Sequence, residues 1–319
     1  MPHDFDLLVV GDANPDVVLG PLDAPLAFGQ REQLVASGGL TLGGSAAIMA
    51  CGAARLGLRV ALAARVGDDG AGRFVRDALA ARGVDTGALG VDPGLPTPLT
   101  AVLTRGDDRA ILTAPGTLAA TGPQDVPPRL LAASRHVHTA SYFLLPRLAA
   151  ALPGLLRTAH GHGATTSLDT NDDPAGAWDP DGLAAVLPHI DILLPNAAEA
   201  RALVGGAVSG TEAAAGALAA RGPLVAVKDG AAGGLAHDGH APVRAPGLAV
   251  RPVDTVGAGD SFDAGFVAAF LAGLPTADAL ALAAVCGSLS TRAPGGTAAQ
   301  PTWDEARAAV TTRNRENPS

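Results

Sequence analysis

Short apolar runs alternate with alanine-rich helical segments along most of this chain, and this alternation restricts the fold more than any other feature. Strands are predicted at residues 5–10, 59–66, 135–139, 164–168, 190–194 and 224–228. Helices are predicted near residues 45–56, 70–82, 147–160, 181–187, 197–204, 211–221, 260–272, 276–290 and 303–312. Strands separated by helices form a largely parallel sheet that is covered on both faces. The pattern therefore predicts an α/β chain whose ligands bind at the carboxyl ends of the strands.

Two segments break the alternation. Residues 15–42 lack helical periodicity and contain several Gly and Pro residues, and residues 97–114 read as two strands, 97–103 and 109–113, joined by a turn. We expect the two segments to form a small β-sheet that projects from the core as a lid. An uncovered lid sheet can pair with that of a second subunit, so a homodimer is a further expectation. No repeat or linker divides the rest, and residues 1–319 are predicted to form a single domain.

Charge and composition argue against several classes of partner. The net charge is −9 and no basic run is present, which argues against a nucleic-acid partner. No apolar run is long enough to span a membrane, and the N-terminus lacks a signal-peptide pattern, so a cytoplasmic protein is expected. Cys51 and Cys286 lie in Ala/Gly-rich stretches and are interpreted as small buried residues. The histidines, among them His136 and His138 on one predicted strand, show no metal-ligand spacing and are interpreted as structural.

The clearest chemical signal is the segment 254–266, Asp-Thr-Val-Gly-Ala-Gly-Asp-Ser-Phe-Asp-Ala-Gly-Phe. The turn Gly257–Ala258–Gly259 lets backbone N–H groups approach an anion, and the following helix N-terminus adds partial positive charge. Asp260 comes directly after the turn, where a carboxylate can take a proton from a hydroxyl while the N–H groups hold a phosphoryl group. The simpler alternative is that Asp260 only caps the helix behind a tight turn.

Polar side chains follow several of the predicted strands. Asn14 and Asp16 flank a proline after the first strand and can hydrogen-bond vicinal hydroxyls, although turn chemistry alone explains the pattern. Asn196 and Glu199 follow strand 190–194, and their spacing is also that of a capping box. Lys228 ends strand 224–228 and is the only lysine in the chain. Its position is either chance or that of a point charge placed near phosphate.

These motifs, taken in order, resemble those of the PfkB/ribokinase family of small-molecule kinases. Residues 254–262 are similar to the family's C-terminal signature Asp-Thr-x-Gly-Ala-Gly-Asp-x-Phe, and residues 42–57 are similar to its N-terminal signature. The resemblance runs from Gly11 to about Thr297. It implies a ribokinase-like three-layer α/β/α sandwich with a mostly parallel central sheet and a small β-sheet lid. It also implies an ATP-dependent kinase that phosphorylates a primary hydroxyl of a sugar or sugar-like molecule.

The resemblance assigns a role to each matching residue. It makes Asp260 the catalytic base. It assigns acceptor binding to Asn14, Asp16, Gly43, Gly44, Ile48 and Asp169. It assigns nucleotide and phosphate binding to Asn196, Lys228, Gly230, Gly257, Ala258 and Gly259. Glu199 is expected to bind Mg²⁺ through water, and Asp254 is expected to contribute to a monovalent-cation site, which leaves activation by K⁺ open.

Two positions depart from the family pattern. Ile48 replaces an asparagine that contacts the sugar, which leaves the acceptor open and makes a nucleoside kinase of the same family the alternative. Asp173 replaces an arginine that often serves acidic or phosphorylated substrates, which favours a neutral acceptor. A Rossmann-type oxidoreductase is disfavoured because the third glycine of its fingerprint is missing. A sugar sensor without catalysis is disfavoured by the intact Asp260 and its glycine turn.

Overall fold

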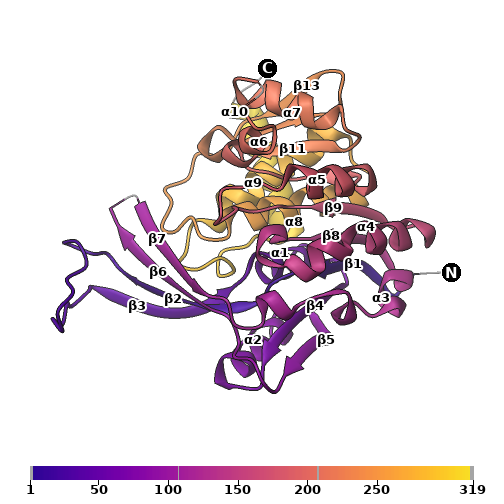
Figure 1. Ribbon diagram of the computed structural model, residues 1–319. Coiled ribbons are helices and arrows are strands. Elements are labelled where there is room, and N and C mark those ends of the chain that lie inside the picture. Colours follow the sequence, from indigo (N-terminus) through magenta and orange to yellow (C-terminus); the bar gives the residue numbers. More distant parts are fainter. Residues whose placement is uncertain (1–2, 107, 207, 317–319) are drawn as a thin grey trace.

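The computed structural model of the chain describes residues 3–106, 108–206 and 208–316. Its main body is a nine-stranded sheet in the order β13-β12-β11-β10-β9-β8-β1-β4-β5 (Figure 1). Neighbouring strands are parallel except that β12 pairs antiparallel with both β11 and β13. The strands are β1 (Phe5–Val10), β4 (Val60–Gly67), β5 (Asp85–Asp92), β8 (Ser134–Thr139), β9 (Thr165–Leu168), β10 (Ile192–Leu193), β11 (Leu224–Lys228), β12 (Gly234–His237) and β13 (Pro242–Ala245).

Helices cover both faces of this sheet because its strands are apolar on both sides. In β1, Leu7 and Val9 pack into one core, while Leu8 and Val10 pack into the opposite one. One layer consists of α1 (Ser45–Arg55), α2 (Gly70–Ala80), α8 (Ala258–Leu271), α9 (Thr276–Ser290) and α10 (Trp303–Glu316). The other consists of α3 (Pro128–Ala133), α4 (Pro146–Gly161), α5 (Pro180–Val186), α6 (Ala197–Leu203) and α7 (Thr211–Ala219). The predicted three-layer α/β/α class is confirmed.

The predicted elements agree with the observed ones except at a few places. Strands β5, β12 and β13 and helix α3 were not predicted. β5 contains two glycines, and β12 and β13 have only four residues each, so none of them shows a clear apolar alternation. Helix α8 begins two residues earlier than predicted, which changes the position of Asp260 within it. None of the helices in the described part of the chain is both long enough and apolar enough to cross a bilayer.

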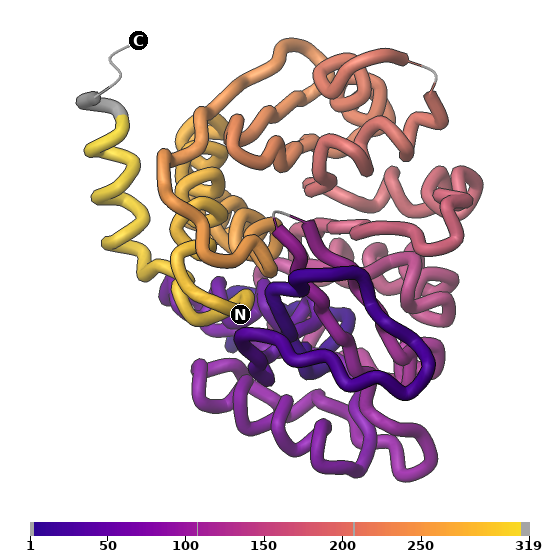
Figure 2. The backbone as a smooth tube through the Cα atoms, turned by 90° about the vertical axis from the view of Figure 1, so that its left-hand side faces the viewer, coloured from indigo at the N-terminus to yellow at the C-terminus, as the bar shows by residue number. Residues whose placement is uncertain are grey.

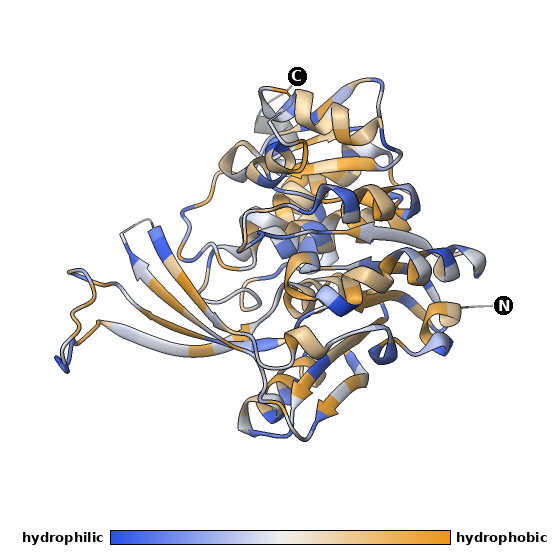
Figure 3. Cartoon of the chain, viewed as in Figure 1, coloured by the Kyte–Doolittle hydropathy of each residue, from blue (hydrophilic) through white to orange (hydrophobic). Residues whose placement is uncertain are grey.

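A second, four-stranded sheet projects from one side of the main body (Figure 1), and in Figure 2 the segments that form it lie in front of the main body. Its order is β3-β2-β6-β7, with β2 (Asn14–Gly20), β3 (Ser37–Gly43), β6 (Leu99–Arg105) and β7 (Asp108–Ala114). The strands come from the two segments that break the alternation. Figure 3 shows hydrophobic residues on these projecting strands as well as in the main body. Apolar side chains on them include Leu40 and Leu112, which are 53% and 58% exposed.

Candidate active site

The carboxyl ends of the parallel strands bring the predicted polar residues to one edge of the sheet. Asp12 follows β1, Asp169 follows β9, and Lys228 ends β11. Asn196, just after β10, forms a parallel bridge with Lys228. Helix α8 begins at the same edge, since the Lys228 side chain runs along its first turn: a Cβ added to Gly259 would lie 3.3 Å from Lys228 Cδ. The strand ends and the α8 N-terminus therefore form one site.

Asp260 is the third residue of α8. The N-cap position belongs to Gly257, whose φ of 72° lies in the left-handed region, so the alternative that Asp260 only caps the helix is wrong. In the first helical turn, the Ala258 N–H donates to the Thr255 carbonyl oxygen at 3.3 Å, whereas the Gly259 and Asp260 N–H groups have no acceptor within the helix and are available to an anion. The Asp260 carboxyl group and these N–H groups therefore occupy the same turn, as proton transfer to the base and binding of a phosphoryl group require.

The surroundings of Asp260 favour its protonated form. The residue is 8% exposed. Burial raises the pKa of Asp260 to about 8, and the charges of Asp169 and Asp12 act in the same direction. Lys228 and a hydrogen bond with Ser45 oppose this rise in pKa. A carboxyl group with a pKa near the working pH is well suited to general base catalysis.

Gly257, the first residue of the glycine turn, is packed too tightly to accept a side chain. A Cβ added to Gly257 would lie 2.6 Å from the Cα of Gly296 and 2.9 Å from Cγ2 of Ile48. Ile48 is 3% exposed and packs beneath the turn. The sequence predicts Ile48 as an acceptor contact, and this stays a prediction; the structure places its side chain against the backbone that precedes α8. Its apolar character is explained by this packing.

Lys228 is held by two buried carboxylates. Its Nζ lies 2.5 Å from Asp169 Oδ2 and 3.1 Å from Asp263 Oδ2. Only 11% of the Lys228 side chain is exposed, against 1% for each of the two aspartates. The phosphate contact of Lys228 and the acceptor contact of Asp169 stay predictions, and the structure adds that the two side chains pair with each other. Sequence analysis missed Asp263, although its spacing of three residues from Asp260 places both on one face of the helix.

Asn171 connects this ion pair to Asp260. Its Nδ2 donates to Asp169 Oδ2 at 3.2 Å and to Ser45 Oγ at 2.9 Å, and Ser45 in turn contacts Asp260. Its Oδ1 accepts a hydrogen bond of 2.7 Å from the Ser141 backbone N–H. Asn171 has a φ of 54°, a left-handed conformation that is uncommon for a residue other than glycine. Such conformations occur where surrounding contacts hold a functional residue in place.

A second group of polar residues lies where β2 begins. Asn14 Nδ2 donates to Asp16 Oδ1 at 2.8 Å and to Thr100 Oγ1 at 3.1 Å. These hydrogen bonds connect the two residues predicted to bind the substrate to strand β6 of the projecting sheet. Burial raises the pKa of Asp16 to about 7, helped by the Asp12 charge, while Asn14 opposes the rise. Asp12, which sequence analysis missed, accepts hydrogen bonds of 3.1 Å from the Ser45 and Ala46 N–H groups at the start of α1.

Gly43 leaves room for the Asp16 carboxyl group. A Cβ at position 43 would lie 2.0 to 2.4 Å from the three atoms of that group. We expect Gly43→Ala to displace Asp16 and raise the KM for the acceptor about tenfold or more, the cost of one hydrogen bond to a charged group. Gly39→Ala on the same strand is the matched control, because a Cβ there meets nothing within 4 Å. Steady-state kinetics with varied acceptor measure the effect, and equal KM values for the two variants would contradict this role of Asp16.

Asn196 and Glu199 form a complete capping box at the start of α6. Asn196 Oδ1 accepts hydrogen bonds of 2.9 Å from the Ala198 and Glu199 N–H groups, and Glu199 Oε2 accepts one of 2.7 Å from the Asn196 N–H. The second Glu199 oxygen accepts a hydrogen bond from Asn196 Nδ2 at 2.5 Å. The capping box, which was the structural explanation of this motif in the sequence, is therefore present. Burial, followed by the Asp169 charge, raises the pKa of Glu199 to about 7.

Asp254 joins the segment before α8 to the loop after α9. Its Oδ1 accepts a hydrogen bond of 2.9 Å from the Val256 N–H, and its Oδ2 accepts one of 2.8 Å from the Gly295 N–H. The neighbouring Thr255 hydroxyl accepts a hydrogen bond of 3.0 Å from Arg109 on β7. The projecting sheet therefore contacts the segment that leads into α8. Gly230 lies after β11 in a short turn with a φ of 56°.

Comparison with known proteins gives a family and a fold. A family model described as "pfkB family carbohydrate kinase" matches residues 4–303. The "ATP-dependent ribose-1-phosphate kinase" of Halopiger xanaduensis is 33% identical over 308 residues, which cover 96% of this chain and 98% of that protein. A solved "putative Ribokinase II in complex with ATP and Mg+2" from E. coli has a TM-score of 0.85 at 23% identity and covers 96% of this chain and 99% of its own. An adenosine kinase structure from Sinorhizobium meliloti has a TM-score of 0.83 at 24% identity, covering 98% and 99% of the two chains.

Proposed function

The chain belongs to the pfkB family of carbohydrate kinases, and from this premise we propose that Asp260 is the base that activates a primary hydroxyl of a sugar for phosphorylation by ATP. The observation that carries the proposal is the position of Asp260 in the first turn of α8, directly behind the Gly257–Gly259 turn. The start of one helix then positions both the proton acceptor, Asp260, and the N–H groups that bind the anion. A buried carboxyl group with a raised pKa supports this role.

In the reaction, the acceptor oxygen forms a bond to the γ-phosphorus while the bond from that phosphorus to ADP breaks. Asp260 takes the hydroxyl proton as the acceptor oxygen attacks. The N–H groups at the start of α8 hold the oxygens of the transferred group, whose charge spreads as the bonds change. Asn14 and Asp16 hold other hydroxyls of the sugar and so orient the reacting one. Positioning and electrostatics supply most of the rate enhancement.

Mg²⁺ accompanies ATP in this proposal, and it would neutralise charge on the phosphates. Both carboxylate oxygens of Glu199 already accept hydrogen bonds from Asn196, so Glu199 fits a contact through water rather than a direct one. Asn196 holds Glu199 in this orientation. The sequence-based assignment of Glu199 to Mg²⁺ thus remains a proposal of the water-mediated kind.

The acceptor is proposed to be a sugar, with a nucleoside as the alternative within the family. Ile48 gives no support to a nucleoside, because its side chain packs beneath Gly257 and Gly296. Arg109 is the cationic side chain that lowers the pKa of Asp16, although burial and Asp12 outweigh it. It could meet an anionic group on the acceptor, so phosphorylated sugars belong among the candidates beside the neutral acceptor that Asp173 favours.

One assay tests the acceptor, ATP and the metal ions together. ADP release is measured with ribose, ribose 1-phosphate, fructose, 2-dehydro-3-deoxygluconate and adenosine as acceptors. We expect release to depend on a sugar acceptor and to stop when EDTA removes Mg²⁺. Replacement of Na⁺ by K⁺ tests the proposed role of Asp254, and equal rates in the two salts would count against it. Release with adenosine alone would favour the nucleoside alternative.

The projecting sheet is proposed to act as a lid and to carry a homodimer contact. Strand register places Leu40, Val17, Ala101 and Leu112 in one row across β3, β2, β6 and β7, so the exposed Leu40 and Leu112 share a face. Sedimentation at assay concentrations should show a dimer that Leu112→Asp dissociates. A wild-type monomer would contradict the contact.

The two free, buried cysteines and the use of ATP support the expected cytoplasmic location.

A further inference from the structure

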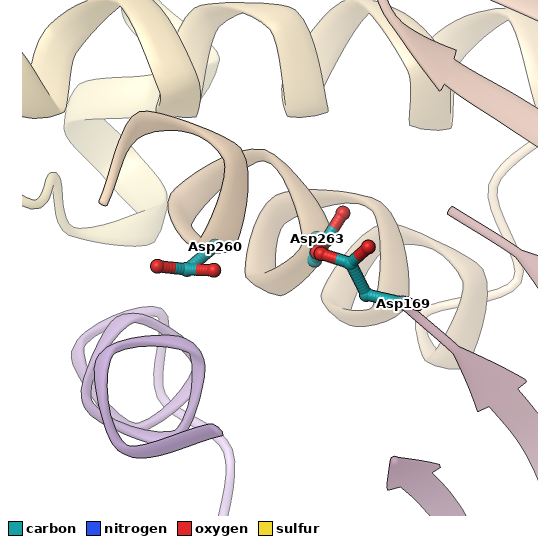
Figure 4. A group of neighbouring side chains, drawn as sticks. All are labelled: Asp169, Asp260 and Asp263. Atoms are coloured by element: carbon teal, nitrogen blue, oxygen red, sulfur yellow. The ribbon is translucent and has the colours of Figure 1, made fainter. Parts of the chain in front are cut away.

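The part of the site that the proposed mechanism leaves unused is the group formed by Asp169, Lys228 and Asp263. Figure 4 shows the carboxyl groups of Asp169 and Asp263 next to each other, with Asp260 nearer the start of α8. One carboxylate oxygen from each of the three aspartates lies within 4.8 Å of the other two. The Lys228 ammonium contacts Asp169 and Asp263. The structure therefore already holds one cation among these carboxyl groups.

The charges of this group do not balance if both aspartates are ionised. Asp169 and Asp263 are each 1% exposed, and one ammonium group can neutralise only one of them. A buried carboxylate without its own countercharge is costly, and such a group normally takes up a proton instead. The Asp169–Lys228–Asp263 group therefore calls for one bound proton to become neutral.

The hydrogen bonds point to Asp263 as the carrier of that proton. Asp169 accepts hydrogen bonds from the Asn171 N–H at 3.1 Å, from Asn171 Nδ2 and from Lys228. Asp263 Oδ1 is buried and has no hydrogen-bond partner among the described residues. An ionised carboxylate has no proton to donate, whereas a protonated Asp263 can donate to the neighbouring Asp169. Lys228 already binds Asp263 Oδ2, so protonation of Oδ1 gives a partner to the one oxygen of this side chain that otherwise lacks one.

We propose that Asp169 and Asp263 share one proton, carried on Asp263, so that with Lys228 they form a neutral group and leave Asp260 as the carboxyl group of this cluster that gains and loses charge during the reaction. The proposal rests on the proposed role of Asp260. Burial raises the pKa of Asp263 well above its ordinary value, with Asp169 adding to the rise and Lys228 opposing it. Burial acts on Asp169 too, but Lys228 and hydrogen bonds outweigh it and lower the pKa of that group.

The consequence is that Lys228 and Asp263 act as positioning residues for Asp260. The groups whose charges or hydrogen bonds act on the pKa of Asp260 are Asp169, Lys228, Asp12 and Ser45, and Asp260 in turn acts on Asp263. A second ionised aspartate beside Asp169 would raise the pKa of Asp260 further and leave the base protonated to higher pH. The shared proton removes that charge without removing the side chain.

Infrared difference spectroscopy on the whole protein counts the proton directly and needs no turnover. At about pH 7 we expect the difference between wild type and Asp263→Asn to show the loss of one carboxylic-acid C=O band. In Asp169→Asn, the remaining Asp263 should ionise to balance Lys228, so the same band is lost again. Asp6→Asn is the control, because a hydrogen bond from Arg59 lowers the pKa of Asp6 to about 2, so this variant should lose a carboxylate band only.

Loss of a carboxylate band instead of an acid band in Asp263→Asn would overturn the proposal. Loss of a carboxylate band in Asp169→Asn would overturn the sharing of the proton. The pH dependence of kcat/KM gives a second measurement. We expect the acidic limb of Asp263→Asn to keep its midpoint near pH 8, whereas removal of an ionised aspartate would lower the midpoint by about one pH unit. If the infrared bands change as expected but the wild-type protein shows no kinase activity, the proposed function is refuted while the shared proton is supported.

Discussion

Asp260→Asn is expected to lower kcat about 10²- to 10⁴-fold, the range that a positioned general base contributes. The amide has the size of the carboxyl group but cannot take the acceptor proton. The same substitution is expected to raise the free energy of unfolding. Burial, followed by the Asp169 charge, raises the pKa of Asp260 from 3.8 to about 8, so the folded protein binds a proton that the unfolded chain releases more easily. Wild-type stability therefore falls as the pH rises between these values, and the variant avoids that loss.

Kinetics and thermal unfolding of the purified variant measure the two effects. The gain in stability should be largest above about pH 8, where the wild-type side chain must ionise while buried. Asp278→Asn is the matched control, because Asp278 also lies in the first turn of a helix, α9, but is exposed. Near-normal turnover by Asp260→Asn would show that another group is the base. A loss of both activity and stability would indicate a structural role for Asp260.

Lys228→Met is expected to have the largest effect on stability, about 3 to 5 kcal/mol, because it removes the cation from two buried aspartates. Without Lys228, Asp169 loses the ammonium group that lowers its pKa. Burial then favours the protonated form of Asp169. The folded variant binds a proton that the unfolded chain does not hold at neutral pH. Its free energy of unfolding therefore falls further as the pH rises above the ordinary pKa of aspartate.

Urea unfolding at several pH values measures this dependence. Arg244→Met is the control, since it removes an exposed ion pair with Glu212 at 2.7 Å, and such pairs contribute about 0 to 1 kcal/mol. We expect the difference between the two variants to shrink toward acidic pH, where Asp169 is protonated in both the folded and the unfolded state of Lys228→Met. Equal destabilisation by both substitutions would contradict the ion pairing of Lys228 in the folded protein.

The sequence predicts the layers of this fold because alternating apolar strands and helices leave few other arrangements. It does not predict β12 and β13, since four residues are too few to show a period. Their pairing depends on register with β11, which is a tertiary property. The projecting sheet could be located because it interrupts the alternation. Its order cannot be read from the sequence, since β2 pairs in parallel with β6, which lies far along the chain.

The sequence predicts most of the residues of the candidate site but few of the contacts between them. Asp260 and its glycine turn form a local pattern, so sequence alone locates them. The partners of Lys228 lie 59 and 35 residues away, and only the fold brings them together. Asp263 was missed because its part in the site depends on burial beside Lys228, a contact that the local sequence does not show. Ile48 shows the reverse case, since its departure from the family pattern is explained by packing against Gly257 and Gly296.

The central claim is that this chain transfers the γ-phosphoryl group of ATP to a sugar hydroxyl with Asp260 as the base. Phosphorus NMR of ATP, Mg²⁺ and the best acceptor from the ADP-release assay tests this claim most directly. With wild-type protein we predict a new sugar phosphomonoester signal that grows as fast as ADP, and with Asp260→Asn we predict almost none. ATP consumption without a sugar phosphomonoester, or equal product formation by the two proteins, would contradict the claim.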